Sequence, residues 1–252
     1  MVPDLEHLPG IPKEEFLDLV RQALGRSSTP APAPEYPRLK ETVAELEAQA
    51  QEVERSNSEN REALAARFLE TAKLRGWKVH RASNTEDALG CLSSIVTSLD
   101  VGRAVRSDQD VFQELSLDLA LQGLGIKVTT IARDEEHSRE TLREEIVAAG
   151  VGITGADYAV AETGSVVILP RKGLSRLVSL VPPVHIALVR AQEIVESLDN
   201  VFLLRRLDYH RNGGDMGSYL NFISGPSRTA DIEQTLVVGV HGPKEVHLVL
   251  LG

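Results

Sequence analysis

Apolar residues in the first third of the chain recur at helical spacing. The pattern predicts three helices, over residues 11–24, 38–55 and 56–75. In the first of them Phe16, Val20 and Leu24 form one stripe, and Gly25 marks its end. Ser56 and Glu59 have the spacing of a capping box, which predicts that the third helix begins there.

From Trp77 onward, short β-prone runs alternate with helical segments. Strands are predicted over 77–81, 103–107, 126–132, 158–163, 165–170, 177–182, 185–189, 201–204, 221–224, 235–240 and 246–251. Helices are predicted after each of the first three strands and over 191–198. Such alternation is typical of βαβ units. We therefore expect an α/β fold with a mostly parallel sheet and flanking helices.

Proline divides the chain into two parts. Seven of the twelve prolines precede residue 38, and residues 27–37 have the composition of an extended Pro/Ala linker. We expect a helical N-terminal region over 1–75, containing this linker, and an α/β domain over 76–252. The apolar face of the N-terminal helices needs a surface to cover it, either on another subunit or on the same domain.

Charge and composition exclude several classes of protein. The 27 Lys and Arg against 37 Asp and Glu give a net charge of -10, which argues against a nucleic-acid binder. Cys91 is the single cysteine, so the chain cannot hold an iron–sulfur cluster through its own thiols. No apolar run reaches membrane-span length, and the first residues lack the basic and apolar parts of a signal peptide. We expect a cytoplasmic protein without a membrane span.

Glu162, Thr163, Gly164 and Ser165 stand between two β-prone runs. A carboxylate, hydroxyls and a glycine at the end of a strand suit a ligand site, and Gly164 allows a close backbone approach. A tight turn that needs Gly and Thr for its geometry explains the same residues. On the ligand reading, Glu162 is the candidate catalytic residue.

A second candidate stretch follows the run 221–224 and could open a helix. It brings small residues and hydroxyls together with an arginine: Ser224, Gly225, Ser227, Arg228 and Thr229. Backbone N–H groups and a guanidinium suit a carboxylate or a phosphate. A capped loop with a solvated arginine is the alternative.

A third stretch, 205–217, is polar and glycine-rich and is typical of a mobile loop, in which His210 is a candidate acid–base group. The alternative is that His210 is an exposed surface residue without a catalytic role. Residues 171–228 hold eight Lys and Arg against five Asp and Glu, which favours an anionic ligand unless the charges scatter on folding. No HxxH or HExxH spacing indicates a metal site, and no Rossmann or P-loop glycine motif occurs.

Three stretches together resemble the LUD-domain family, in its lactate-utilisation protein C branch. They are GITGADYAVAETGSVVILP (152–170), VPPVHIALVRAQEIVESL (181–198) and FISGPSRTADIEQTLVVGVHGPKEVHLVLL (222–251). The resemblance runs from about Trp77 to the end of the chain. It implies a NagB/RpiA/CoA-transferase-like fold. It also implies an accessory or substrate-handling subunit in the oxidation of L-lactate to pyruvate, with two partner subunits that carry the iron–sulfur clusters.

Two other functions stay open. The turn at Glu162 is similar to the Glu-Asn-Gly turn of CoA transferases, with Thr163 in place of the asparagine, which suggests a stand-alone acyl or CoA transferase or a sugar-phosphate isomerase. The other possibility is a pure assembly module whose N-terminal helices dock on the iron–sulfur subunits.

Overall fold

The computed structural model describes residues 11–26, 35–132, 138–169, 176–230 and 236–252. The chain forms two compact units, Met1–Glu41 and Thr42–Gly252. Residues 27–34 of the predicted linker lie outside the described residues. Helices α2 and α3, which the sequence assigned to the N-terminal region, belong to the same unit as the sheet, because their apolar faces are buried there.

The first unit contains the predicted helix α1 (Lys13–Ala23) and the 3-10 turn η2 (Pro37–Lys40). Glu14 and Glu15 stand in the first turn of α1 and Arg21 in the last, an arrangement that complements the helix dipole. None of the helix residues is buried, and Phe16 is 54% exposed. The apolar stripe of α1 is therefore an uncovered surface within its own unit.

The second unit begins with α2 (Val43–Glu59) and α3 (Arg61–Arg75). Thr42 and Glu45 form a capping box at the start of α2. The predicted box at Ser56 and Glu59 is wrong, because the hydrogen-bond ladder of α2 runs through it and Asn60 donates its N–H to the Ser56 carbonyl.

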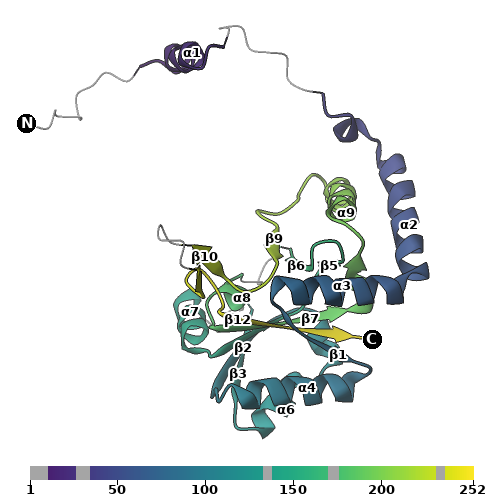
Figure 1. Ribbon diagram of the computed structural model, residues 1–252, viewed down its shortest axis with the longest axis vertical. Helices are drawn as coiled ribbons and strands as arrows, with labels where there is room; N and C mark the ends of the chain where they lie inside the picture. The colour runs from purple at the N-terminus through teal and green to yellow at the C-terminus, as the bar shows by residue number, and fades with distance from the viewer. Residues whose placement is uncertain (1–10, 27–34, 133–137, 170–175, 231–235) are drawn as a thin grey trace, which may run out of the picture. The chain divides into compact units, whose positions relative to one another are not determined.

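A parallel sheet forms the centre of this unit (Figure 1). Among the described residues its strand order is β1 (Lys78–Ala82), β12 (Glu245–Leu251), β7 (Val184–Arg190), β4 (Val151–Thr154), β2 (Arg103–Ser107) and β3 (Lys127–Ile131). Every neighbouring pair is parallel. The predicted α/β fold with a mostly parallel sheet is confirmed.

Helices cover both faces of this sheet, as right-handed crossovers require. One face packs on α4 (Thr85–Ser98), α5 (Val111–Glu114) and α6 (Leu117–Gly123) through a core that includes Leu92, Leu121 and Ile186. The other face packs on α3, α7 (Arg139–Ala148) and α8 (Leu177–Leu180). The sheet is thus the middle layer. Its central strands β12, β7 and β4 are mostly apolar and buried, whereas β1 and β3 at its edges carry polar and exposed residues.

A second sheet lies on the α3 side, in the order β8 (Ile194–Val195), β5 (Tyr158–Val160), β6 (Ser165–Ile168) and β9 (Asn221–Ile223). Helix α9 (Leu198–Arg211) and the 3-10 turn η3 (Ala191–Glu193) adjoin it. A separate antiparallel hairpin consists of β10 (Arg228–Ala230) and β11 (Leu236–Val238). Residues 228–230 are therefore a strand, where the sequence suggested the start of a helix.

Three predicted elements in this region are wrong. Residues 177–182 contain α8 instead of a strand, 201–204 lie in α9 instead of a strand, and 191–198 contain η3 and β8 instead of a helix. The runs 177–182 and 201–204 are apolar and short, and their pattern alone does not distinguish a strand from a helix. In α9 the capping box of Ser197 and Asn200 sets the helix start.

Candidate functional site

The first candidate stretch forms the tight turn between β5 and β6. Gly164 has φ +66°, and a Cβ built there would lie 2.6 Å from the Ala72 nitrogen in α3. A side chain would therefore be strained by the backbone angle and would also collide with α3. Glycine is required here so that the turn can lie directly on α3.

Strand pairing then brings the second stretch to the first. In the antiparallel β6–β9 pair Val166 faces Ile223, so Ser165 meets Ser224 at the next position. Their Oγ atoms lie 2.7 Å apart, and Thr163 donates its hydroxyl to Ser165 Oγ at 2.8 Å. Ser165 Oγ accepts from Thr163 and has a second lone pair, so either serine can be the donor in the bond between Ser165 and Ser224.

The turn after Ser224 rests on the end of α3. Gly225 has φ +129°, and a Cβ there would lie 2.5 Å from the Arg75 carbonyl oxygen. The Arg228 guanidinium lies directly over Gly76, the residue that ends α3 with φ +99°. Both candidate turns thus pack against the same helix end.

A cavity of about 390 Å³ opens between these turns and α9. Its lining residues are Arg75, Thr163, Ser165, Leu198, Phe202, Phe222 and Ser224. Hydroxyls and the Arg75 guanidinium form a polar side, and the rings of Phe202 and Phe222, with centroids 6.2 Å apart, belong to an apolar side. The Arg75 Nε donates to the Thr163 carbonyl at 3.4 Å, which holds this cation at the cavity. A cation, hydroxyls and an apolar wall suit a small carboxylate that carries an apolar group.

Glu162 lies at the start of α9 and is exposed. Its Oε2 accepts the Leu198 N–H at 3.2 Å, so the carboxylate caps the first turn of that helix. Glu162 is not among the residues that line the cavity. The geometry gives it a local role at the helix terminus, and its catalytic role stays a prediction.

The other predicted site residues lie away from the cavity lining. Ser227 accepts the His241 N–H on its Oγ at 3.1 Å and its N–H bonds the Pro243 carbonyl, so it holds the chain after β11. Thr229 pairs with Val237 inside the hairpin. His210 is exposed in the last turn of α9, with its ring against Tyr209, so that part of the predicted loop is helical.

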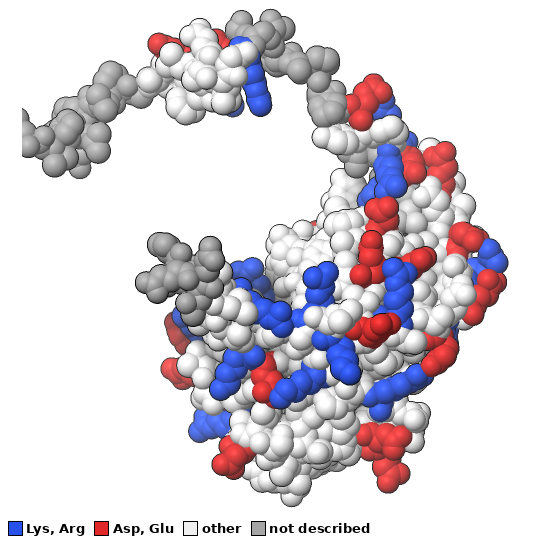
Figure 2. Space-filling view, viewed as in Figure 1, with Lys and Arg blue, Asp and Glu red and all other residues white. Residues whose placement is uncertain are grey.

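Among the described residues, the basic side chains counted between 171 and 228 do not gather at one place. Arg190 pairs with Glu193 and Glu114, Arg205 with Asp208, and Arg211 with Glu47. Figure 2 shows Lys and Arg interspersed with Asp and Glu over the visible face. The positive charge of the cavity therefore comes from Arg75, outside the counted range.

Sequence reasoning missed four of the lining residues: Arg75, Leu198, Phe202 and Phe222. The Ser197–Asn200 capping spacing was a signal that α9 begins at Leu198 and places Phe202 one turn on. Phe222 stands two positions before Ser224 in the same β-run, and side chains at that spacing point to the same face of a strand. Nothing local pointed to Arg75, which joins the site only because both turns pack on the end of α3.

Among the described residues, no group of three or more His, Cys, Asp or Glu side chains could hold a metal ion. Within the same ranges, no helix is long and apolar enough to cross a membrane.

Comparison with known proteins gives one family match and several relatives. The model of the LUD domain matches residues 65–251. The chain is 47% identical over 105 residues to the lactate utilization protein C of Halalkalibacterium halodurans, which covers 41% of this chain and 45% of that protein. It is 29% identical over 246 residues to the lactate utilization protein C of Bacillus pumilus, which covers 94% of this chain and 96% of that protein.

The chain also matches a second kind of lactate utilization protein and a protein of known structure. The lactate utilization protein B of Shouchella clausii is 26% identical over 229 residues, 72% of this chain and 46% of that protein. The chain thus spans less than half of that relative and of the Halalkalibacterium protein. A crystal structure of a DUF162 family protein from Deinococcus radiodurans has the same fold, with a TM-score of 0.53 and 24% identity over 76% of this chain and 98% of that chain.

Proposed function

Because the chain belongs to the LUD domain family, we propose that it serves lactate utilisation as a subunit that binds a small carboxylate in the cavity beside Ser224. The names of its relatives, lactate utilization proteins C and B, support the process. The site geometry supports the ligand class. Within lactate utilisation, we propose that the chain is a substrate-handling subunit in the oxidation of L-lactate to pyruvate.

One observation carries the ligand class, namely the convergence of Arg75, the Ser224 hydroxyl and the Phe202–Phe222 wall on one cavity. A carboxylate there accepts hydrogen bonds from the guanidinium and from Ser224, and the rest of the ligand lies on the aromatic rings. The volume of about 390 Å³ is within the range of small-molecule sites. It leaves room for 2-hydroxy acids longer than lactate.

The proposal includes partner subunits, for which the similarity to a protein named lactate utilization protein B is the support. The iron–sulfur clusters needed for electron transfer would reside in those partners, since Cys91 is the only thiol in this sequence. Removing this chain from a reconstituted lactate-oxidising system should abolish lactate oxidation. Undiminished oxidation without it would contradict the subunit role.

A binding experiment on the full chain tests the ligand class. We expect L-lactate, pyruvate or a longer 2-hydroxy acid to raise the melting temperature, because a ligand at 100 times its dissociation constant adds about 2.7 kcal/mol of stability. Arg75→Ala should abolish that shift. Arg228→Ala is the matched control, since Arg228 lies over Gly76 and does not line the cavity. A shift that depends on Arg228 and not on Arg75 would overturn the assignment of the cavity.

A further inference from the structure

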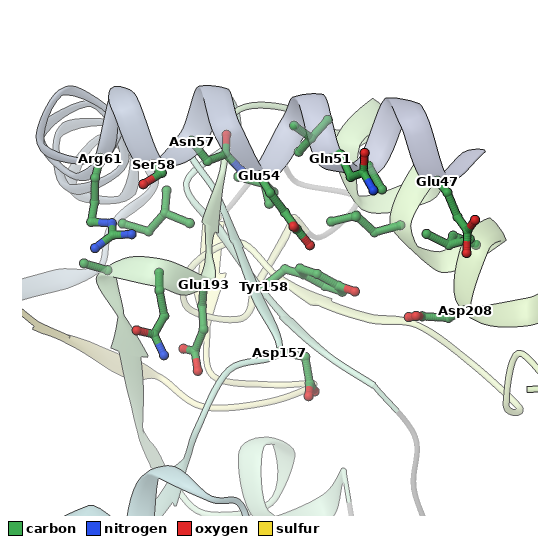
Figure 3. Close-up of a pocket in the computed structure, with 18 of the residues that line it drawn as sticks. Glu47, Gln51, Glu54, Asn57, Ser58, Arg61, Asp157, Tyr158, Glu193 and Asp208 are labelled. Atoms are coloured by element: carbon green, nitrogen blue, oxygen red, sulfur yellow. The ribbon is translucent and has the colours of Figure 1, made fainter. Parts of the chain in front are cut away.

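A second, larger cavity lies under α2, on the other side of α9 (Figure 3). Its volume is about 570 Å³, and its walls come from α2, α9, the start of β5 and the segment 191–195. Helix α2 is fixed here by a small apolar cluster of Leu46, Ala50 and Leu207. Beyond that cluster the polar side of α2 faces the cavity.

Most charged groups on the cavity wall already have partners. Asp157 accepts the Leu169 N–H at 2.7 Å. Three ion pairs satisfy other members of the lining: Glu47 with Arg211 at 3.3 Å, Glu193 with Arg190 at 2.8 Å and Asp208 with Arg205 at 2.8 Å. The opposite charges within each pair largely cancel, so these pairs do not indicate which ligand the cavity binds.

Two charges of opposite sign remain. Glu54 and Arg61 line the cavity, and neither has an ion-pair or hydrogen-bond partner among the described residues. Figure 3 shows the Glu54 carboxylate pointing from α2 into the middle of the cavity, with Arg61 at the far end of the same wall. Glu54 belongs to α2 and Arg61 begins α3, and α2 ends between them at Glu59. The wall is therefore negative at one point and positive at another.

Helix α2 ends at Glu59 and α3 begins at Arg61, so the opposite ends of two helix dipoles meet there and offset each other. The positive charge at this end of the cavity is therefore that of Arg61 itself. Asn57 and Ser58 supply neutral polar groups between the two charges. An anion is favoured at the Arg61 end and a cation beside Glu54.

The opposite wall is suited to an aliphatic chain with one hydrogen-bond donor nearby. Ile194 and Leu204 line it, together with Tyr158. Burial and the Asp208 carboxylate raise the pKa of Tyr158 to about 12, so its hydroxyl stays neutral at physiological pH. A ligand with charges at both ends would lay its methylene groups on the apolar residues.

We propose that this cavity binds an elongated zwitterion, with its ammonium group at Glu54 and its carboxylate at Arg61. The proposal is independent of lactate utilisation and of the cavity beside Ser224. An ordinary α-amino acid carries both charges on one carbon and does not span the two residues. An ω-amino acid carries them at the two ends of a flexible chain and does.

The test uses the purified full chain and 6-aminohexanoate as the probe, measured by isothermal titration calorimetry. We expect saturable binding, with hexanoate and hexylamine at least tenfold weaker because each supplies one charge. The free amino acid alanine should also bind more weakly than 6-aminohexanoate, by a similar factor. Equal affinities for hexylamine and 6-aminohexanoate would contradict zwitterion binding and indicate a site for a simple cation. No binding of 6-aminohexanoate would contradict the proposed site itself.

Variants then locate the probe. Glu54→Gln and Arg61→Gln should each weaken binding at least tenfold, about 1.4 kcal/mol, and both residues are exposed and unpaired, so the fold should be kept. Glu70→Gln is the matched control, since Glu70 is an exposed α3 residue outside both cavity linings. Full affinity in both test variants would contradict the proposal. Arg75→Ala should leave this binding intact, which separates it from the lactate-utilisation site.

Discussion

The Oγ atoms of Ser165 and Ser224 lie 2.7 Å apart, although 59 residues separate them in the chain. Their contact joins the two stretches that carry the candidate chemistry into one site. It follows from the register of β6 and β9, which places the two serines opposite each other just beyond Val166 and Ile223. Ser165 is 3% exposed and links the hydroxyls of Thr163 and Ser224.

Replacing Ser165 with alanine should lower the free energy of unfolding by about 1–2 kcal/mol, because the Thr163 and Ser224 hydroxyls lose their shared partner. Urea unfolding measures this loss. Ser98→Ala is the comparison, since the Ser98 hydroxyl donates to a carbonyl within its own helix turn. An equal, small loss of unfolding free energy in both variants would show that the linked hydroxyls of Thr163, Ser165 and Ser224 do not stabilise the fold.

Gly164→Ala should be far more costly than Gly213→Ala. The two glycines have nearly the same φ, +66° and +65°, so the backbone strain of about 1–2 kcal/mol is common to both. Gly164 alone meets backbone, 2.6 Å from the Ala72 nitrogen, whereas nothing lies within 4 Å of a Cβ at Gly213. The difference between the unfolding free energies of the two variants therefore measures the cost of the collision with α3. Equal unfolding free energies would mean that the turn at Gly164 can shift away from α3.

Glu162→Ala should cost roughly 0.3–1 kcal/mol of stability, the usual value for a carboxylate at a helix N-terminus, and the loss should shrink in high salt. Thermal unfolding at low and high ionic strength measures it. Glu70→Ala, an exposed helical carboxylate away from α9, should show no such salt-dependent loss. A stability unchanged by Glu162→Ala, together with abolished turnover in a reconstituted system, would instead favour the predicted catalytic role.

Stability should fall as the pH drops below about 6.5. Burial lowers the pKa of His185 to about 3, and burial also lowers the pKa of His80 and His247. Between pH 6.5 and the lowered pKa of His185, the unfolded chain binds a proton at this residue that the folded chain does not, so falling pH favours unfolding by up to about 1.4 kcal/mol per pH unit. His80 and His247 act in the same direction.

Urea unfolding between pH 7 and pH 5 tests this dependence in a range above the ordinary titration of carboxylates. His185→Gln should reduce the slope by about one proton, even though it also lowers the overall stability by disturbing the hydrogen bond to Thr154 at 2.9 Å. A slope identical to that of the parent chain would show that His185 does not titrate between the two states.

The sequence by itself determined the elements with strong local signals. The strand predicted over 103–107 has those bounds, and helices follow each of the first three predicted strands as expected, because periodicity depends on near neighbours. The family resemblance, carried by three ordered stretches, is confirmed by the LUD domain match over residues 65–251. Both rest on information that is continuous along the chain.

The tertiary structure alone decided which residues share a site. Residues 201–204 lie in α9, which the local cap of Ser197 and Asn200 begins, but only the position of α9 beside β6 and β9 brings Phe202 to the cavity. Arg75 joined the site, and Glu162 went to a helix terminus, through contacts between segments distant in sequence. Strand register and helix docking are long-range relationships, so the physical reason is that no local pattern encodes the distance between two turns that meet on a third element.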